Sequence, residues 1–362
     1  MRRCFTQWLL APVAIAACFL AAGCSRSGQK MDVPKIKTIA RDNFHGVICP
    51  DARTVYLTGN YGALFKSGDS GEKWTRQDSG IKGESILVDG SFIDASTGWV
   101  AGLHGTVLHT SNGGAVWEKQ QTGTDKHLFS ISFVDKNNGW AAGNWNTIIH
   151  TADGGKTWTR LTPEEDRIYK NVCFVDTANG WVVGEKGAIF RTADGGTTWT
   201  RQMPKKWEAI ADDDFENPKP ALYCVYFTDT KNGWISGIEG TLLKTQDGGD
   251  TWDILPTGTT LSLYTVFVKY GRGWVVGDKG AYLMSEDGGS TWKVYDEAIK
   301  TRTALRDVFF SSADSGWAVG MGGTVVHTTD GGKNWEFYSG LSYAMKFFVM
   351  PKALEFKGMV TE

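Results

Sequence analysis

The chain has 362 residues, 22% of them charged, and its 38 lysines and arginines nearly balance its 40 aspartates and glutamates, for a formal net charge of −2. With no basic stripe along the sequence, this balance argues against nucleic acid as a partner. The six cysteines contain no CxxC pair, so the sequence indicates neither a zinc site nor a disulfide framework. We expect no metal and no cofactor.

The first 23 residues have the pattern of a secretory signal peptide. Residues 8–22 form an apolar run too short for a comfortable membrane span, and small residues precede Cys24. A cysteine at this cleavage point resembles a bacterial lipobox, in which the cysteine is lipidated. We therefore predict a lipoprotein signal peptide at residues 1–23, and a lipidated Cys24 at the head of a polar tether, residues 24–40. The alternative is an ordinary signal peptide with a chance cysteine.

Lipidation at Cys24 predicts an exported protein that is anchored to a membrane and faces the periplasm. Each buried methylene of an acyl chain contributes about 0.8 kcal/mol to such anchoring. Ser25 occupies the position where an aspartate would retain a lipoprotein in the inner membrane, so the outer membrane is favoured in a Gram-negative host. In a cyanobacterial host, the expected location is the lumenal face of the thylakoid.

From residue 67 onward, the chain repeats one motif seven times, close to Ser/Thr-x-Asp-x-Gly-x-Thr-Trp. The copies end at Trp74, Trp117, Trp158, Trp199, Trp252, Trp292 and Trp335. Successive tryptophans lie 43, 41, 41, 53, 40 and 43 residues apart. A period near 41 matches one blade of a β-propeller per repeat. We predict an all-β protein, a single seven-bladed β-propeller over residues 41–352, followed by a C-terminal tail at residues 353–362.

Each repeat contains four short strand patterns. In residues 169–201, the strands are expected near 169–175, 181–184, 188–191 and 198–201, because β-branched and aromatic runs alternate there with Gly, Asn and Asp turns. Tight hairpins join such strands into an antiparallel sheet. Four strands per repeat make one blade.

The repeated acidic motif, here called the Asp-box, has a structural explanation. Its Asp or Asn side chain can accept hydrogen bonds from the backbone N–H groups of its own turn. Its tryptophan offers a large apolar face for packing between blades. We therefore interpret the seven box residues as structural and not as catalytic or metal-binding. They are Asp69, Asn112, Asp153, Asp194, Asp247, Asp287 and Asp330.

Both ends of the repeat region resemble the first strand of a blade, at residues 44–48 and 346–349. We expect one of these segments to complete a blade shared by the two termini, because an open ring would leave exposed strand edges. The sequence leaves open which of the two does so.

The turns between the second and third strands differ from blade to blade, whereas the boxes on the other face are nearly constant. Aromatic and charged side chains occupy turns that need none, which suggests a contact surface. Solvated loop tips or plugging of the central channel are the alternatives. The residues predicted for this partner-binding face are Tyr61, His104, Trp145, Lys186, Trp207, Phe215, Glu239, Lys279 and Met321.

The spacing of 53 residues marks an insertion between the fourth and fifth blades. About 12 extra residues fall within residues 203–220, which contain Trp207, Phe215 and three consecutive aspartates at 212–214. Insertions in repeat proteins map to loops, often on the binding face. A partner-contacting loop, a calcium site at the aspartates and a neutral solvated insertion are all open, although the ligand spacing of a dedicated calcium loop is absent.

Propellers with this box include sialidases and other glycosidases, so a hydrolase has to be weighed. A sialidase would carry an Arg-Ile-Pro motif, which this sequence lacks. Glu185, Glu239 and Asp278 lie in mouth turns of different blades and are the candidates for a pair of catalytic carboxylates. We predict no catalytic residues. The alternative function is a glycoside hydrolase or carbohydrate-binding protein of the sialidase-like or xyloglucanase-like propeller type.

The repeat resembles that of the photosystem II stability/assembly factor family over about residues 40–350. The resemblance rests on Gly-Trp-Val-Val-Gly at residues 180–184, followed by the box at residues 192–199. It implies a seven-bladed, non-enzymatic docking protein that binds a membrane-protein complex or its assembly intermediates. We also expect the lipid anchor to hold the protein at a membrane, and the protein to be a monomer. We carry over this role and not the identity of the client.

Overall fold

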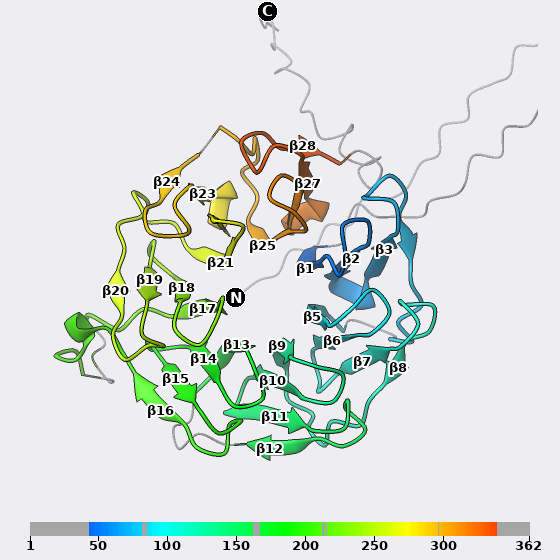
Figure 1. The fold of residues 1–362 in the computed structure, drawn as a ribbon, viewed down its shortest axis with the longest axis horizontal. Coiled ribbons are helices and arrows are strands. Elements are labelled where there is room, and N and C mark those ends of the chain that lie inside the picture. The colour runs from blue at the N-terminus through cyan, green and yellow to red at the C-terminus, as the bar shows by residue number, and fades with distance from the viewer. Residues whose placement is uncertain are drawn as a thin grey trace, which may run out of the picture. The chain divides into compact units, whose positions relative to one another are not determined.

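The computed structural model describes residues 43–81, 85–161, 167–211, 214, 216–295 and 297–338. Their strands form seven four-stranded antiparallel sheets arranged as a ring, so the predicted seven-bladed β-propeller is confirmed (Figure 1). No helix among the described residues is long and apolar enough to cross a membrane. Several predictions concern residues outside the described ranges. These are the signal peptide, Cys24, the tether, Phe215, residues 346–349, the C-terminal tail and both limits of the propeller domain.

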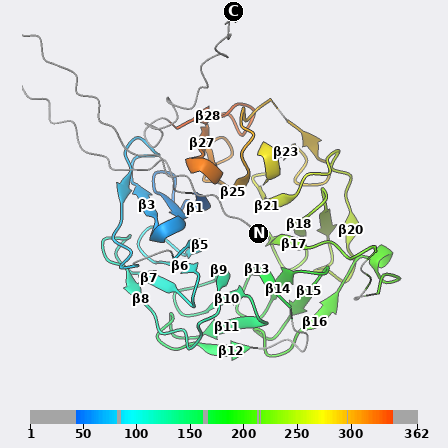
Figure 2. The ribbon, with the colours of Figure 1, turned by 180° about the vertical axis from the view of Figure 1, so that it is seen from behind.

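The four strands of each blade follow one another in the chain, and the first lies innermost, around the centre of the ring in both views (Figures 1 and 2). The first strands are β1 (Phe44–Ile48), β5 (Leu87–Phe92), β9 (Leu128–Phe133), β13 (Tyr169–Phe174), β17 (Leu222–Phe227), β21 (Leu263–Lys269) and β25 (Leu305–Phe310). The second strands are β2 (Val55–Gly59), β6 (Gly98–Gly102), β10 (Gly139–Gly143), β14 (Gly180–Gly184), β18 (Gly233–Gly237), β22 (Arg272–Gly277) and β26 (Gly316–Gly320).

The third and fourth strands form the outer part of each blade. The third strands are β3 (Leu64–Ser67), β7 (Val107–Thr110), β11 (Thr147–Thr151), β15 (Ile189–Thr192), β19 (Leu242–Thr245), β23 (Tyr282–Ser285) and β27 (Val325–Thr328). The fourth are β4 (Thr75–Arg76), β8 (Glu118–Lys119), β12 (Thr159–Leu161), β16 (Thr200–Gln202), β20 (Asp253–Ile254), β24 (Lys293–Val294) and β28 (Glu336–Phe337). Four single 3₁₀ turns are described, η1 (Asn60–Gly62), η2 (Lys205–Trp207), η3 (Asp278–Gly280) and η4 (Met321–Gly323).

The ring closes without a blade shared by the two termini, so that prediction is wrong. Strand β1 is the first strand of a blade, as expected, but it pairs with β2 of its own blade, and β25–β28 complete the last blade by themselves. Side chains join the two blades instead. Asp307 Oδ2 accepts a hydrogen bond of 2.8 Å from the backbone N–H of Val47, and Asn43 Oδ1 accepts one of 2.8 Å from Gly322.

Tryptophans of the second strands connect each blade to the next. Trp274 is fully buried, and its ring stacks on Phe310 of the following blade with centroids 3.6 Å apart. Its Nε1–H donates to the carbonyl oxygen of Gly331, in the box of that blade, over 2.9 Å. Trp99, Trp140, Trp181 and Trp234 make the equivalent bond to Gly154, Gly195, Gly248 and Gly289. In the first blade, Tyr56 takes this place and donates its hydroxyl to the carbonyl of Gly113.

Each Asp-box closes its own turn by a hydrogen bond. Asp153 Oδ1 accepts a 2.9 Å bond from the backbone N–H of Thr157, and the Thr157 hydroxyl donates to Oδ2 over 2.6 Å. These bonds, the hydroxyl first, hold the pKa of Asp153 at about 2. The same 2.9 Å bond from the N–H four residues on is made by Asp69, Asn112, Asp194, Asp247, Asp287 and Asp330.

The three cysteines of the described residues carry free thiols. Cys49 and Cys224 are buried and Cys173 is partly buried. Burial raises the pKa of all three thiols, so they remain protonated and occupy space as small apolar side chains.

Candidate partner-binding face and central channel

The seven turns between second and third strands open on one face, here called the mouth face, because all blades have the same strand order and direction. In six blades the tip residue of the turn is not glycine, although its backbone is left-handed. These tips are Tyr61, His104, Trp145, Lys186, Glu239 and Lys279, with φ between 52° and 57°. A left-handed conformation costs a non-glycine residue about 1–2 kcal/mol. Glycine serves at the seventh tip, Gly322, so the other six side chains are not required by the turn.

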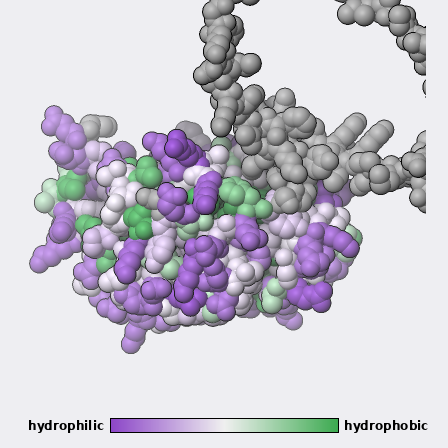
Figure 3. All heavy atoms as spheres, turned by 90° about the horizontal axis from the view of Figure 1, so that it is seen from above, coloured by the Kyte–Doolittle hydropathy of each residue, from purple (hydrophilic) through white to green (hydrophobic). Residues whose placement is uncertain are grey.

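Two of the tips carry large exposed aromatic rings. Trp145 is 65% exposed and Tyr61 is 51% exposed, and neither the indole N–H nor the phenol hydroxyl bonds to a described residue. Seen edge-on, the coloured surface of the propeller is mostly hydrophilic with small separate hydrophobic patches (Figure 3). Exposed aromatic side chains on such a surface are typical contact residues. Met321, which precedes the seventh tip, is partly buried.

Arginines of the fourth strands hold both aromatic tips from behind. Arg160 Nη2 donates to the carbonyl oxygen of Trp145 over 3.2 Å and to that of Asn146 over 3.3 Å. Arg76 Nη2 donates to the carbonyl oxygen of Tyr61 over 3.3 Å. The backbone of each tip is therefore tethered while its ring projects outward.

Trp207 does not lie on the exposed surface as predicted. It is 7% exposed and packs in the core between the fourth and fifth blades with Trp181 and Leu222. A Cβ atom on Gly187, at the foot of the Lys186 tip, would lie 3.4 Å from its ring. The insertion thus reaches the mouth face, but its tryptophan supports a turn from below and is not accessible to a partner.

Asp214 is the one described residue among the three consecutive aspartates of the insertion. Its Oδ1 accepts hydrogen bonds from the backbone N–H groups of Glu216 and Asn217, over 3.0 and 2.9 Å, which is a turn role. Within the described ranges, no group of three or more His, Cys, Asp or Glu side chains could hold a metal ion.

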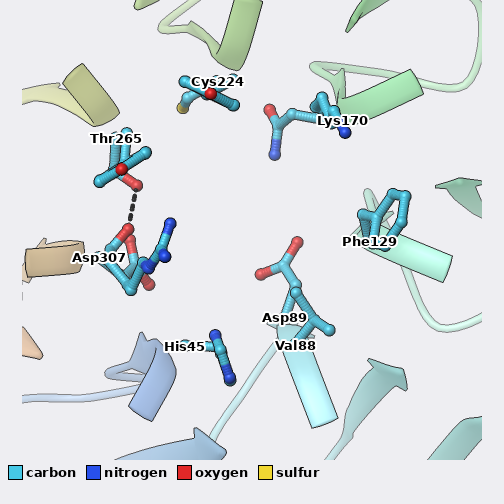
Figure 4. Close-up of a pocket in the computed structure, with 12 residues that line it drawn as sticks. His45, Val88, Asp89, Phe129, Lys170, Cys224, Thr265 and Asp307 are labelled. Atoms are coloured by element: carbon cyan, nitrogen blue, oxygen red, sulfur yellow. Dashed lines mark hydrogen bonds between the residues drawn. The ribbon is translucent and has the colours of Figure 1, made fainter. Parts of the chain in front are cut away.

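A second set of variable side chains, which sequence reasoning missed, surrounds the central channel just below the mouth face. A β-bulge near the start of every first strand inserts one extra residue, and a bulge re-aims the side chain it carries. These residues line a cavity of about 310 Å³ (Figure 4). They are His45, Val88, Phe129, Lys170, Tyr223, Tyr264 and Arg306.

These seven bulge residues are here called the channel ring. Its lysine and its arginine differ in their partners. Lys170 Nζ lies 3.1 Å from Glu185 Oε1 and 5.3 Å from the centroid of the Phe129 ring. The guanidinium of Arg306 lies over the Tyr264 ring, with Cζ 4.3 Å from its centroid. Among the described residues, no carboxylate forms an ion pair with Arg306.

Two buried carboxyl groups belong to the channel wall. Asp307 accepts hydrogen bonds from Val47 and from Val308, both through backbone N–H groups, and Asp89 accepts from Ile131 and Gly90. In Figure 4, both are seen beside the central space. Burial, opposed by these hydrogen bonds, raises the pKa of Asp307 to about 7 and also raises that of Asp89.

These carboxyl groups connect neighbouring blades, and both occupy the same position of the repeat, directly after the bulge residue of the first strand. In the fourth blade, the position belongs to Asn171, whose Oδ1 accepts from Val225 of the next blade over 3.0 Å and whose amide donates to Ser130. Asp89 and Asp307 make the same kind of cross-blade bond. Their raised pKa values therefore follow from a structural role in a buried wall.

A smaller cavity of about 180 Å³ lies beside the channel on the mouth face. Trp145, Arg167, Ile168, Glu185 and Lys186 line it. Glu185 of this cavity forms an ion pair with Lys170, which lines the central channel. The cavity beside the Trp145 indole is therefore adjacent to the mouth of the channel.

The three carboxylates considered for hydrolysis are not assembled into one described cavity. Glu185 is engaged by Lys170 over 3.1 Å. Glu239 is an exposed tip of the fifth blade, and Asp278 begins η3 in the sixth. The two carboxylates of a glycosidase have to flank the scissile bond across one cleft. Among the described residues, no two of these three carboxylates line the same cavity.

Comparison with known proteins identifies relatives at the family and fold levels. The family model described as photosynthesis system II assembly factor YCF48 matches four overlapping segments, residues 77–167, 161–262, 201–293 and 254–344. Together these segments span well over half of the chain. No curated protein matches the sequence.

Solved structures with the same fold include two of YCF48 and one glycoside hydrolase. The structure titled "YCF48 bound to D1 peptide" is 20% identical, with a TM-score of 0.65 over 81% of this chain and 93% of that chain. YCF48 from Cyanidioschyzon merolae is 17% identical, with a TM-score of 0.63 over 81% and 97%. The GH74 xyloglucanase from Xanthomonas campestris is 12% identical, with a TM-score of 0.67 over 83% of this chain but 55% of the enzyme. At these identities the similarity is one of fold.

Proposed function

The chain belongs to the photosynthesis system II assembly factor YCF48 family, and on this premise we propose that it is a non-enzymatic docking protein that binds a membrane-protein partner or its assembly intermediates through the mouth face. A YCF48 structure is described as bound to a D1 peptide, which supports a polypeptide segment as the partner. We further propose that lipidated Cys24 holds the propeller at a membrane, close to such a partner.

The placement of Tyr61 and Trp145 carries the proposal. Both rings stand on left-handed tips at φ values of 57° and 54°, where glycine would have a lower conformational free energy. Both are more than half exposed, and both backbones are tethered by arginine. Tyr270 offers a contrast, since it is an exposed left-handed tyrosine of the opposite face whose hydroxyl donates to the Ser311 carbonyl over 2.9 Å. Within the described part of the chain, the side chains of Tyr61 and Trp145 make no such internal bond, which favours an external role.

Site-specific photo-crosslinking in native membranes tests the docking face. A photoreactive amino acid replaces Trp145 or Tyr61 in the full-length protein, and Val116 or Tyr270 serves as control. Val116 is 54% exposed and lies in the box turn of the second blade, on the opposite face. We expect one integral membrane protein to be recovered from both mouth positions and from neither control. Crosslinks that are equal from both faces, or absent from the mouth, would reject the docking face.

The glycoside hydrolase alternative is favoured by one observation, the similarity of fold to the xyloglucanase. This chain spans about half of that enzyme, whereas it spans nearly all of each YCF48 chain. Incubation of the purified protein with a panel of aryl glycosides tests the alternative. Turnover that is lost in Glu239→Ala or Asp278→Ala would establish a hydrolase and reject the non-enzymatic proposal.

A further inference from the structure

One side of the central channel presents hydrogen-bond donors that the described residues leave unused. They are the hydroxyl groups of Tyr223 and Tyr264 and the guanidinium of Arg306, from the first strands of the fifth, sixth and seventh blades. We propose that this side of the channel is a binding site for a carboxylate ligand, with Arg306 as the cation and the two tyrosines as flanking donors. This inference concerns the channel and does not rest on the proposed docking function.

Arg306 is held in place without being neutralised. Its guanidinium lies 4.3 Å from the centroid of Tyr264, and its Nε atom is buried with no hydrogen-bond partner among the described residues. A planar guanidinium matches a carboxylate in a two-point geometry.

The two tyrosines line the same cavity side by side. Their rings are 5.2 Å apart between centroids, and neither hydroxyl bonds to a described residue. Burial, with a smaller contribution from Tyr264, raises the pKa of Tyr223. Its hydroxyl therefore keeps its proton near neutral pH and remains a donor.

The positions of the channel ring on either side of this set lack the unused capacity. Lys170 is already paired with Glu185 over 3.1 Å, and His45 Nε2 bonds to Asn60 Oδ1 over 2.7 Å. Burial is the main cause that lowers the pKa of His45, so its imidazole adds no positive charge at neutral pH. Arg306 is therefore the one unpaired cation among the described residues that line the cavity.

The charge around the site favours a ligand with a single negative charge. The carboxyl groups of Asp89 and Asp307, whose pKa values are raised by burial, lie in the same wall, and their ionised fraction repels a dianion more strongly than a monoanion. A carboxylate thus fits better than a doubly charged phosphate. The cavity volume of about 310 Å³ suits a small organic acid or the carboxylate end of a peptide.

Calorimetric titration of the full-length protein tests the site with sodium benzoate, its neutral isostere benzamide, inorganic phosphate, and acetyl-trialanine with a free or an amidated C-terminus. We expect benzoate or the free-acid peptide to bind at least about 10-fold more tightly than its neutral counterpart and than phosphate, since one charge-assisted bond is worth about this factor. The tighter of the two acids identifies the source of the carboxylate as a small molecule or a chain end.

Substitutions place the ligand within the channel. Arg306→Gln should weaken carboxylate binding at least about 10-fold, and Tyr223→Phe and Tyr264→Phe should each weaken it several-fold while keeping the rings. Arg302→Gln is the matched control, because it removes the same charge from an exposed residue four positions away. The proposal is overturned if no carboxylate binds, if acids and amides bind alike, or if Arg306→Gln and Arg302→Gln have equal effects. The tyrosine variants decide the question if Arg306→Gln fails to fold.

Discussion

The guanidinium of Arg160, on an outer strand, donates a 3.2 Å hydrogen bond to the backbone carbonyl of Trp145, the most exposed of the large hydrophobic residues described. The bond fixes the main chain of a left-handed tip and leaves the indole outside. Arg76 does the same for Tyr61. Two aromatic side chains are thus presented on rigid supports, which reduces the conformational entropy that a partner has to remove on binding.

Arg160→Gln should loosen this tip with little effect on global stability. The lost hydrogen bonds are exposed and contribute about 0.5–1 kcal/mol. Hydrogen exchange should therefore accelerate in residues 144–146 and stay unchanged in β10 and β11, as measured by mass spectrometry. Arg76→Gln is the matched control and should affect the Tyr61 tip instead. Equal exchange in the wild type and Arg160→Gln would show that the arginine does not restrain the tip.

The same substitution should lower stability much more at a repeat tryptophan than at the exposed tryptophan. Trp274→Phe removes the donor to the Gly331 carbonyl and part of a buried ring, at a cost of about 2–4 kcal/mol. Trp145→Phe alters an exposed side chain and should change stability by less than about 0.5 kcal/mol. Thermal and denaturant unfolding of both variants measures the difference. Similar losses in the two variants would contradict the division into structural and exposed tryptophans.

The buried carboxyl group of Asp307 should make stability depend on pH. Its pKa is about 7 in the folded protein and about 3.9 in an unfolded chain, so the folded state binds more protons between these values. Stability should fall as pH rises from about 4 to 7, by up to about 4 kcal/mol for this group, and level off above 7.

Asp307→Asn should remove this contribution. Asparagine at the equivalent position of the fourth blade, Asn171, already accepts from the next blade and donates to the preceding one. Denaturant unfolding at pH 5 and pH 8 should therefore show a smaller difference in Asp307→Asn than in the wild type. Asp253→Asn, at an exposed aspartate of β20, should retain the wild-type difference. An unchanged difference in Asp307→Asn would refute the assignment.

Lipidation of Cys24 can be tested apart from the fold. Cells grown with an alkyne fatty acid should incorporate the label into the wild-type protein and not into Cys24→Ala, and the variant should leave the membrane fraction. Cys49→Ala, in the propeller, should keep the label. Equal labelling of the wild type and Cys24→Ala would contradict the predicted anchor.

The number of blades and their strands could be predicted because each box and each Gly-Trp segment repeats at a nearly fixed distance. The aromatic tips could also be predicted, because Tyr61 and Trp145 occupy turns that other copies build with different residues. Comparison of the copies within one chain distinguishes the side chains that every turn needs from those that occur in single copies only.

The channel ring could not be predicted in the same way, because a bulge is defined by how two strands pair and not by the residues of one strand. Lys170 and Arg306 look like ordinary solvent-facing strand residues until the register with the second strand is known. Trp207 was misassigned for a related reason. Its insertion resembles a polar loop, and only its long-range packing beneath Gly187 makes it part of the core.

The most direct test of docking at the mouth face is quantitative co-purification of the crosslinked membrane protein with full-length variants. The double variant Tyr61→Ala/Trp145→Ala should recover at least about 10-fold less partner than the wild type, since exposed aromatic anchors each contribute about 1–2 kcal/mol to an interface. The double variant Val116→Ala/Tyr270→Ala, on the opposite face, should recover the wild-type amount. Undiminished recovery by the mouth variant, or equal loss in both, would contradict the proposal.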